Sequence, residues 1–556
     1  MPLAACKSTS PPVPLSKGAF VFALAVCGSI LGLGVLSRFS AGAVLDDAFM
    51  FVRYADRVLS EGRMAWNPGG EATYGPTSCL YLGVVVGVRI FAPGNAAFTA
   101  GLSSLIAGVC FLVLLAGLFR RCTDAPRGGE RLLILAAFFF IAASAYDTAS
   151  HFVSGMDTTF ALAFLTAYLW IGKWHECTRS RAGVLWMGLW GGLAFFARPD
   201  LLIYSFLIPA SMVVFGSDSR MVRHGVWILG ITAVVASGQV WLASACFNSP
   251  LPLSFYAKGM GLYSDFLVEQ YRLVPLVEGL SYLASYWYLF LIIGADLAFN
   301  FDAWRYRVSA VDRGLLVATC LFLLYYLLFV LQIMPSPQRF YYPTLPALLF
   351  LAAQGAVRLV ERMPGAIRRE ISGTSKSVRI FAAFLLLGCL FPGALSVCRA
   401  VGSQVYRGNL LNFDIFDNYE KRLSAYWFGL DAFSRLPDDL VIATTEVGRP
   451  AAMNPEKRIV DLTGLNETGF AHAGFSADRL FQTCRPDLIY MPHPHYRGMI
   501  KQIANHPHFV EHYAHFPAST LGAVMGVALR RDSEYFSLMH NIVNRGITDG
   551  RADQHF

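Results

Sequence analysis

Charged residues are scarce in this sequence. Only 15% of its 556 residues are Asp, Glu, Lys or Arg, whereas 55% are hydrophobic. Because a soluble globular domain carries about 25% charged residues, the composition excludes an ordinary soluble protein and indicates a membrane protein. The 11 cysteines include no CxxC pair and no zinc-type spacing. Most of them lie in apolar runs, so cysteine indicates neither a metal site nor a disulfide framework.

Long apolar runs are abundant. Residues 19–39, 225–247 and 314–333 each reach the ~20 apolar residues that cross a bilayer, and about eight more runs qualify between residues 97 and 398. The first run is too long for a signal peptide and no small-residue cleavage site follows it, so we expect a span. Residues 79–92 are shorter and contain Arg89, which indicates a re-entrant or interfacial segment. We predict about 11 spans in all.

The placement of basic residues predicts the orientation. Alternate loops hold 18 Lys or Arg, and the intervening loops hold 7. The basic loops are 120–131, 173–181, 217–224, 303–313 and 358–379, and the others are 40–77, 150–157, 198–200, 248–280 and 334–340. Because basic loops stay in the cytoplasm, the second set faces outward. The net charge of +8 therefore reflects topology and requires no nucleic-acid partner.

The chain divides into three parts. Residues 1–18 are a polar cytoplasmic lead, residues 19–398 a helical membrane domain, and residues 399–556 a soluble α/β domain outside the membrane. In the last part, residues 414–436 have the pattern of an amphipathic helix. Four β-rich runs follow it: LVIATTEVG (440–448), RIVDL (458–462), DLIYM (487–491) and AVMGVAL (523–529).

Two adjacent carboxylates, Asp46 and Asp47, stand where the chain leaves its first span. Charge so close to hydrocarbon is costly, so we expect these two residues to have a functional role. A helix N-terminus favours acidic residues, which explains one aspartate better than two. Adjacent helical positions point about 100° apart, so one carboxylate can act on a substrate while the other caps or tunes the helix. A divalent cation held by both is the alternative.

Three cations lie at the outer membrane edge. Arg198, Lys258 and Arg339 each stand near a proline, and Lys258 is the only outward lysine among the three between residues 18 and 398. Cations so placed suit a phosphate at the bilayer surface. Basic residues at span ends also snorkel, although in this chain such residues gather on the inside. Asp157 and Asp200 also lie in loops of the outward set, where helix capping is the competing interpretation.

The outward motifs resemble those of the GT-C membrane glycosyltransferases. The run DDAFMFVRYADRVLSEGRMAWNPGGEATYGPTS is followed by SGMDTTF, ARPD, PLSFYAK, QRFYYPTLP and RIVDLTGLNE. The order is closest to the group containing the mycobacterial-type arabinofuranosyltransferase that caps arabinan. That group usually has Glu at the position of Asp157. The resemblance implies a GT-C fold and a bacterial plasma-membrane protein whose active site and soluble domain face the periplasm or outside.

The implied reaction is transfer of a sugar, plausibly arabinofuranose, from a polyprenyl-phosphate carrier to an envelope glycan, lipid or protein. Asp46 is then the base and Asp47 its neighbour, or the reverse, and Arg198, Lys258 and Arg339 bind the donor phosphate. The site residues expected to contact substrate are Arg53, Trp66, Tyr74, Asp157, Asp200 and Tyr256. No cofactor follows from the sequence beyond the divalent cation already named. A transporter or flippase of lipid-linked sugar is the alternative, but it would place polar residues at mid-membrane.

Two features stay open. Trp66 and Tyr74 offer faces for a sugar, yet interfacial aromatic residues also form the normal membrane belt. Six of the 12 histidines lie in residues 493–515, without a known metal-ligand spacing. Surface or acceptor contact is the favoured interpretation there, with metal binding as the alternative.

Overall fold

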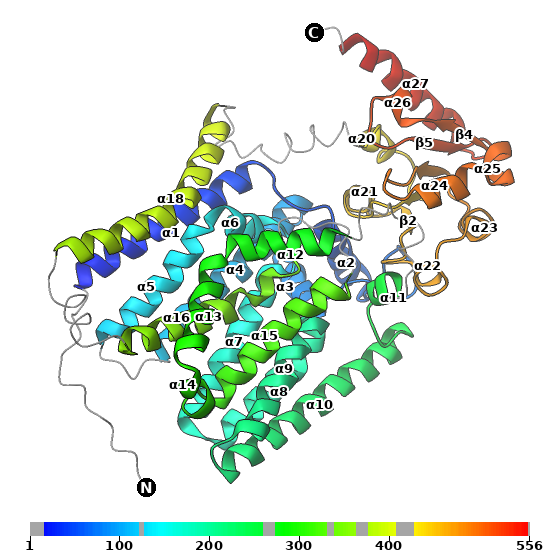
Figure 1. Cartoon of the computed structure of the whole chain (residues 1–556). Coiled ribbons are helices and arrows are strands. Elements are labelled where there is room, and N and C mark those ends of the chain that lie inside the picture. Colours follow the sequence, from blue (N-terminus) through cyan, green and yellow to red (C-terminus); the bar gives the residue numbers. More distant parts are fainter. Residues whose placement is uncertain are drawn as a thin grey trace.

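The computed structural model describes residues 16–121, 127–259, 273–330, 338–362, 376–406 and 427–553. A helical bundle is followed by a small α/β domain at one end of it (Figure 1). The bundle contains α1 (Lys17–Ser40), α2 (Ala48–Glu61), α3 (Cys79–Phe91), α4 (Ala96–Arg121), α5 (Arg127–Ala143), α6 (Ala145–Val153), α7 (Thr158–Thr178), α8 (Arg181–Ala197), η1 (Pro199–Leu201), α9 (Leu202–Phe215), α10 (Ser219–Phe247), α11 (Leu253–Gly259), α12 (Val274–Ser285), α13 (Trp287–Phe299), α14 (Phe301–Tyr306), α15 (Ala310–Leu328), η3 (Tyr342–Thr344), α16 (Leu345–Arg362) and α18 (Lys376–Tyr406).

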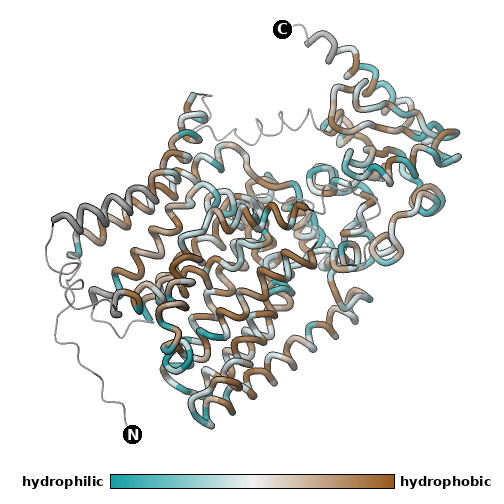
Figure 2. The backbone as a smooth tube through the Cα atoms, in the orientation of Figure 1, coloured by the Kyte–Doolittle hydropathy of each residue, from teal (hydrophilic) through white to brown (hydrophobic). Residues whose placement is uncertain are grey.

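Helices α1, α4, α10 and α15 are long and apolar enough to cross a membrane. Two more spans result if each sharply bent pair counts as one, α5 with α6 at 82° and α12 with α13 at 76°. Figure 2 shows apolar residues along these helices and a more polar soluble domain. The protein is therefore a multi-pass membrane protein. The described residues give four to six spans by this measure. The sequence predicted about 11. Helices α3, α8 and η1–α9 are apolar but shorter than 18 residues, which accounts for part of the difference.

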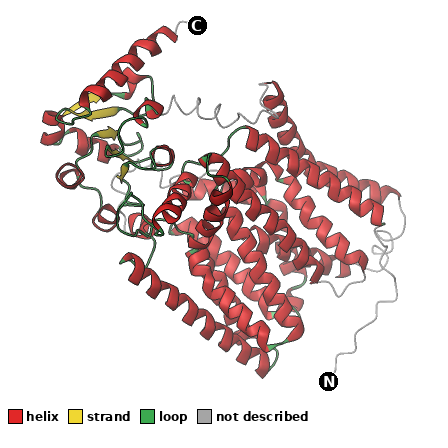
Figure 3. Cartoon of the chain, turned by 180° about the vertical axis from the view of Figure 1, so that it is seen from behind, coloured by secondary structure: helices red, strands yellow, loops and turns green. Residues whose placement is uncertain are grey.

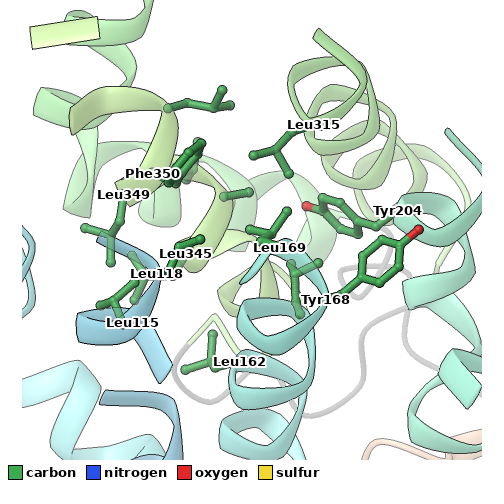
Figure 4. Packing of buried hydrophobic residues seen from close by; sticks show 14 of the residues in the cluster. Leu115, Leu118, Leu162, Tyr168, Leu169, Tyr204, Leu315, Leu345, Leu349 and Phe350 are labelled. Carbon is green, nitrogen blue, oxygen red and sulfur yellow. The ribbon is translucent and has the colours of Figure 1, made fainter. Parts of the chain in front are cut away.

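Helix α7 forms the centre of the bundle. Most of its side chains are buried, and Leu162 and Leu169 pack against leucines of α4 and α16 (Figure 4). Near its far end the buried Lys173 pairs with Glu176 and Asp312, at 2.6 Å each. Full pairing is what allows a charge in such a position. The packed helix thus fixes the position of its N-terminal end, which follows Asp157 and lies opposite to Lys173.

The soluble domain contains a five-stranded sheet in the order β2-β1-β3-β5-β4 (Figure 3). Strands β2, β1 and β3 run parallel, whereas β5 is antiparallel to β3 and β4. The elements are α20 (Leu430–Phe433), β1 (Val441–Thr444), α21 (Arg449–Met453), β2 (Arg458–Asp461), α22 (Thr468–Ala473), α23 (Ala477–Arg479), η4 (Leu480–Cys484), β3 (Leu488–Tyr490), α24 (Arg497–Ala504), α25 (Pro507–His512), β4 (Tyr513–Phe516), α26 (Ala518–Leu521), β5 (Val527–Arg530) and α27 (Phe536–Asp553).

Each of the four predicted β-rich runs contains a strand, and β4 was not foreseen. The predicted amphipathic helix falls mostly on residues 414–426, outside the described residues, as does most of the polar lead. A continuous apolar core joins the two parts, because Phe51 and Val52 of α2 belong to the same buried cluster as Ile442 and Ile459 of the sheet. The soluble domain is therefore packed onto α2 and not merely tethered to the bundle.

Candidate active site

A cavity of about 210 Å³ lies where the bundle meets the soluble domain. Its walls come from the starts of α2 and α7, the turn between α8 and α9, helix α11, the end of α15 and the loop before η3. Leu465, in the loop after β2, adds a contact from the soluble domain. These are the loops that the charge pattern assigned to the outer side. The fold thus brings segments far apart in the sequence to one place.

The cavity has a charged part and an apolar part. Six charged side chains, all singled out from the sequence, line it: Asp47, Asp157, Asp200, Arg198, Lys258 and Arg339. Aromatic side chains share the wall, chiefly Phe255, Tyr325, Phe329 and Phe340. Such a lining suits a ligand with an ionic head and a hydrocarbon tail.

Asp47 faces two cations. Its carboxylate accepts a hydrogen bond from Arg339 at 2.8 Å. Burial alone would raise the pKa of Asp47, but the charges of Arg339 and Lys258 overcome this effect and lower it. Burial and the charge of Arg339 lower the pKa of Lys258 to about 8, although Asp47 opposes the change. No hydrogen bond or ion pair reaches the Lys258 ammonium group from the described residues, so it can receive an anionic ligand.

The backbone at Gln338 holds Arg339 in the cavity. Gln338 has φ +59°, a left-handed backbone conformation that residues other than glycine rarely adopt. Its backbone N–H donates to Glu278, and its side-chain amide donates to Ser281 and Ser285. These bonds offset the strain, which is the kind found at functional sites.

Arg198 lies among oxygen acceptors. It donates to Asp200 at 2.7 Å and to the Tyr326 hydroxyl at 3.2 Å, and it pairs with Asp157 at 3.5 Å. The Tyr326 hydroxyl donates to Asp200. Asp157 occupies the N-cap position of α7 but makes no side-chain capping bond. Capping therefore does not explain Asp157, whose carboxylate faces Arg198 and accepts from Thr77 at 3.4 Å.

Asp46 has a different environment from its neighbour. Its two carboxylate oxygens accept the backbone N–H groups of Gly448 and Arg449, at 3.0 and 2.8 Å. Burial raises the pKa of Asp46 to about 6 against these two bonds, and the charge of Asp47 adds to the rise. Asp46 does not line the cavity, whereas Asp47 does. The two adjacent carboxylates thus point to different partners.

No protein-family model and no curated protein matches the sequence. Among solved structures, the chain is similar to ArnT from Cupriavidus metallidurans bound to undecaprenyl phosphate, with a TM-score of 0.53 and 12% identity over 92% of this chain and 98% of that one. ArnT in the apo state gives the same values. The Archaeoglobus fulgidus oligosaccharyltransferase gives a TM-score of 0.49 with 12% identity, over 93% of this chain and 75% of that one, which is too distant to carry an argument.

The chain has the GT-C fold. The fold class predicted from the sequence is thereby confirmed. Four of the residues predicted to contact substrate nevertheless lie outside the cavity lining in this fold. Arg53, Trp66, Tyr74 and Tyr256 do not line the cavity.

Arg53 is buried, and its guanidinium donates to four backbone carbonyls, those of Trp66, Ala451, Asn454 and Lys457. A fifth bond goes to the side chain of Asn67. All its donors are therefore occupied by the protein, and Arg53 ties α2 to the soluble domain. The sequence predicted a substrate contact for Arg53, whereas the structure shows its guanidinium bonded within the protein.

The aromatic residues of the loop after α2 are also internal. Trp66 is 1% exposed, and its indole N–H donates to the Ile459 carbonyl. Tyr74 is 1% exposed and stacks on Phe247. Neither a sugar platform nor a membrane belt fits residues so enclosed. Tyr256 packs against His472 of the soluble domain, with ring centroids 4.2 Å apart.

Sequence reasoning missed Glu446, a buried acid of the soluble domain. Glu446 follows β1 and is 5% exposed, and the charges nearest its carboxyl group are Asp46, Asp47 and Asp461. Its place directly after a β-rich run was the available signal, since residues that follow parallel strands gather at one edge of a sheet.

Metal binding gains no geometric support. In the described ranges, no group of three or more His, Cys, Asp or Glu is placed to hold a metal ion. In the histidine-rich stretch, His506 contacts Asp478 and Phe481, and His508 lies against His512. The side chains of the acidic pair are already held by backbone N–H groups and by Arg339.

Proposed function

We propose that the protein is a glycosyltransferase that moves a sugar from a polyprenyl-phosphate carrier to an acceptor outside the membrane. The observation that carries this proposal is the gathering of Asp47 and three cations, from four separate outward segments, in one partly aromatic cavity. The GT-C fold supports it. So does the ArnT structure with bound undecaprenyl phosphate, because a lipid phosphate of that kind matches the charged and apolar parts of this cavity.

The cations have a clear chemical task in this reaction. The leaving group is a phosphate monoester with a second pKa of about 6, so it departs without a protonating acid. What it requires is stabilisation of the charge that develops on its oxygens. Arg339 and Lys258 supply it beside Asp47, and Arg198 supplies it from the α8 end. Asp200 and Tyr326 orient Arg198 for this purpose.

Asp47 is the base in this mechanism. An acceptor hydroxyl oxygen attacks the anomeric carbon, the carbon–oxygen bond to phosphate breaks, and its electron pair leaves with the polyprenyl phosphate. The hydroxyl proton passes to the Asp47 carboxylate and then to solvent. The donor phosphate competes for Arg339, which frees Asp47 and raises its proton affinity at the moment when a base is needed. Asp46, bound by two backbone N–H groups, positions the loop instead.

The finer assignments rest on the sequence motifs. Arabinofuranose is the proposed sugar, an envelope glycan the proposed acceptor, and the bacterial plasma membrane the proposed location, with the cavity on the outer side. The basic-loop pattern supports that orientation, because every charged cavity residue belongs to a loop poor in Lys and Arg.

Release of undecaprenyl or decaprenyl phosphate from a panel of synthetic polyprenyl-phosphate sugars tests the proposal. The purified protein in nanodiscs is compared with Asp47→Asn and, as a matched control, Asp56→Asn, whose residue pairs with Arg89 outside the cavity. We expect Asp47→Asn to lower turnover at least 100-fold, in the range for removal of a general base, while donor binding persists. Asp56→Asn keeps the wild-type rate.

Equal turnover by Asp47→Asn would refute the base assignment. Absence of turnover by the wild type with every donor, with membrane extract as acceptor source, would refute the transferase. Uptake of the lipid-linked sugar across vesicles under the same conditions would then support a transporter.

A further inference from the structure

A second cavity, of about 690 Å³, lies at the other end of the bundle from the candidate active site. Its walls are the end of α4, the last turns of α7, the segment from the end of α13 to the start of α15, and α16. Figure 1 shows α14 at the end of the bundle that is turned away from the soluble domain. Lys173 of this cavity lies roughly 24 Å along α7 from Asp157, at 1.5 Å per residue. The cavity is therefore a separate site, and its volume falls in the range of about 300–1,000 Å³ that is usual for ligand pockets.

Buried ion pairs hold the walls of this cavity in place. Asp296 is fully buried and accepts hydrogen bonds from Arg358 at 2.6 Å and from the Trp304 indole at 2.8 Å. This carboxylate joins α13, α14 and α16. Lys173 joins α7 to the start of α15, because it pairs with Asp312 at 2.6 Å. Charges paired in this way inside the protein fix the helices around the cavity, so the site is formed before a ligand arrives.

The cavity also contains charged groups of both signs that are available to a ligand. Arg121 and Arg307 line it, and among the described residues no acidic side chain pairs with either of them. Asp302 also lines it and has no cationic partner in the same described ranges. Glu176 has a buried oxygen, Oε1, without a hydrogen-bond partner in the described part of the chain. A buried carboxylate oxygen without a partner is costly, and a ligand that donates a hydrogen bond would satisfy it.

The position of the cavity suits a membrane lipid. Helix α4 ends at Arg121 and helix α15 begins at Ala310, and both are long and apolar enough to cross a bilayer. Phe299, Phe301 and Tyr306, which flank the cavity residues around α14, are 63%, 64% and 69% exposed. Aromatic side chains are typical of the boundary between hydrocarbon and headgroups. A phospholipid can therefore place its headgroup in the cavity while its acyl chains pack on these aromatic side chains.

We propose that this cavity binds a phospholipid whose headgroup joins a phosphate diester to a primary ammonium group. The phosphate lies between Arg121 and Arg307, because guanidinium groups suit phosphate oxygens. The ammonium group donates to Glu176 and Asp302. A headgroup with phosphate alone would leave both carboxylates unmatched, and a quaternary ammonium group has no hydrogen to donate.

The inference goes beyond the proposed transferase reaction and does not depend on it. Four of the five loops predicted to face the cytoplasm supply residues to the cavity, so the lipid belongs to the inner leaflet. Because the lipid contacts α4, α7 and α14 together, it binds the folded bundle and stabilises it by mass action.

Native mass spectrometry of the delipidated full-length protein in detergent tests the inference, through the affinity of the first bound lipid. Three dioleoyl phospholipids with the same phosphate diester are the probes. Phosphatidylethanolamine has a primary ammonium group, phosphatidylcholine a quaternary one, and phosphatidylmethanol none. Glycerophosphoethanolamine offers the first of these headgroups without acyl chains. Arg121→Gln and Arg307→Gln are compared with Arg120→Gln and Arg305→Gln, which change neighbouring arginines outside the cavity lining.

We expect phosphatidylethanolamine to bind about tenfold more tightly than the other two lipids, as one charge-assisted hydrogen bond provides. Arg121→Gln and Arg307→Gln should each weaken that binding about tenfold, and the two neighbouring substitutions should leave it unchanged. Glu176→Gln should remove the preference for phosphatidylethanolamine over phosphatidylcholine. Asp302→Asn, at an exposed residue, tests the same preference if thermal unfolding shows that Glu176→Gln is not folded.

Two results would overturn the inference: equal affinities for the three lipids, or wild-type affinity in both Arg121→Gln and Arg307→Gln. Binding of glycerophosphoethanolamine as tight as that of the lipid would overturn the lipid assignment and indicate a soluble phosphate ester. Failure of the transferase proposal leaves these outcomes unchanged, since none of the measurements involves turnover.

Discussion

Replacing Arg53 by methionine is expected to loosen the soluble domain from the bundle. The guanidinium donates to three carbonyls of that domain, at 2.7, 2.9 and 2.8 Å, from a fully buried position. Methionine keeps the apolar length of the side chain but offers no donor, so these carbonyls lose a partner. A buried carbonyl left without a donor costs about 1–3 kcal/mol, so with three carbonyls affected we expect a loss of at least about 3 kcal/mol in the free energy of unfolding of the soluble domain.

The assay is thermal unfolding of the purified protein, combined with limited proteolysis of the soluble domain. Arg63→Met is the matched control, because Arg63 lies just after α2, has a side chain that is 45% exposed and pairs with Glu61 near the surface. A surface pair of that kind contributes less than about 1 kcal/mol. An Arg53→Met protein with the unfolding temperature of the wild type but without activity would refute this reasoning. That result would support the sequence-based prediction that Arg53 contacts substrate.

Three other substitutions separate packing from ligand binding. Gly448→Ala should lower the unfolding temperature, since its Cβ meets the Asp46 carbonyl oxygen at 1.9 Å, whereas Gly83→Ala, with open space around it, should not. Lys258 is charged below its pKa of about 8, so the affinity for undecaprenyl phosphate should fall as pH rises from 7 to 9.5. Lys258→Arg should abolish that fall, even though the pKa of Glu446 is also about 8. Tyr326→Phe removes a hydroxyl group that contacts Arg198 and Asp200. Calorimetry should show undecaprenyl phosphate binding that is about tenfold weaker. Tyr306→Phe, which changes an exposed tyrosine, is the control.

The charged lining of the cavity could be predicted because two physical rules act on it locally. Charge is costly beside hydrocarbon, and basic residues are retained inside, so Arg198, Lys258 and Arg339 stood out as exceptions in the outward loops. Both rules operate within a single loop and need no knowledge of the tertiary structure. The strands β1, β2, β3 and β5 were predictable for a similar reason, because short β-rich runs bounded by turn residues are a local pattern.

The residues at the domain interface could not be assigned in this way. Arg53 and Trp66 resemble substrate contacts in the sequence, but their partners, such as Lys457 and Ile459, lie about 400 residues later in the chain. Glu446 had the opposite problem, since a single glutamate in a soluble domain is ordinary until the fold places it against Asp46. Strand β4 pairs with β5, and its four residues, at the end of the histidine-rich stretch, give no β pattern by themselves.

The acidic pair shows how the interface and the chemistry depend on each other. Adjacent residues at the start of a helix point about 100° apart, and in this structure Asp46 and Asp47 accordingly have different partners. Asp46 binds Gly448 and Arg449 of the soluble domain, and Asp47 binds Arg339 of the bundle. Because the two share one backbone segment, docking of the soluble domain fixes the position of the proposed base. It also places Leu465 in the wall of the cavity. A bundle without its soluble domain would keep the three cations of the cavity but lose the Leu465 contact and the restraint that the Asp46 bonds place on Asp47.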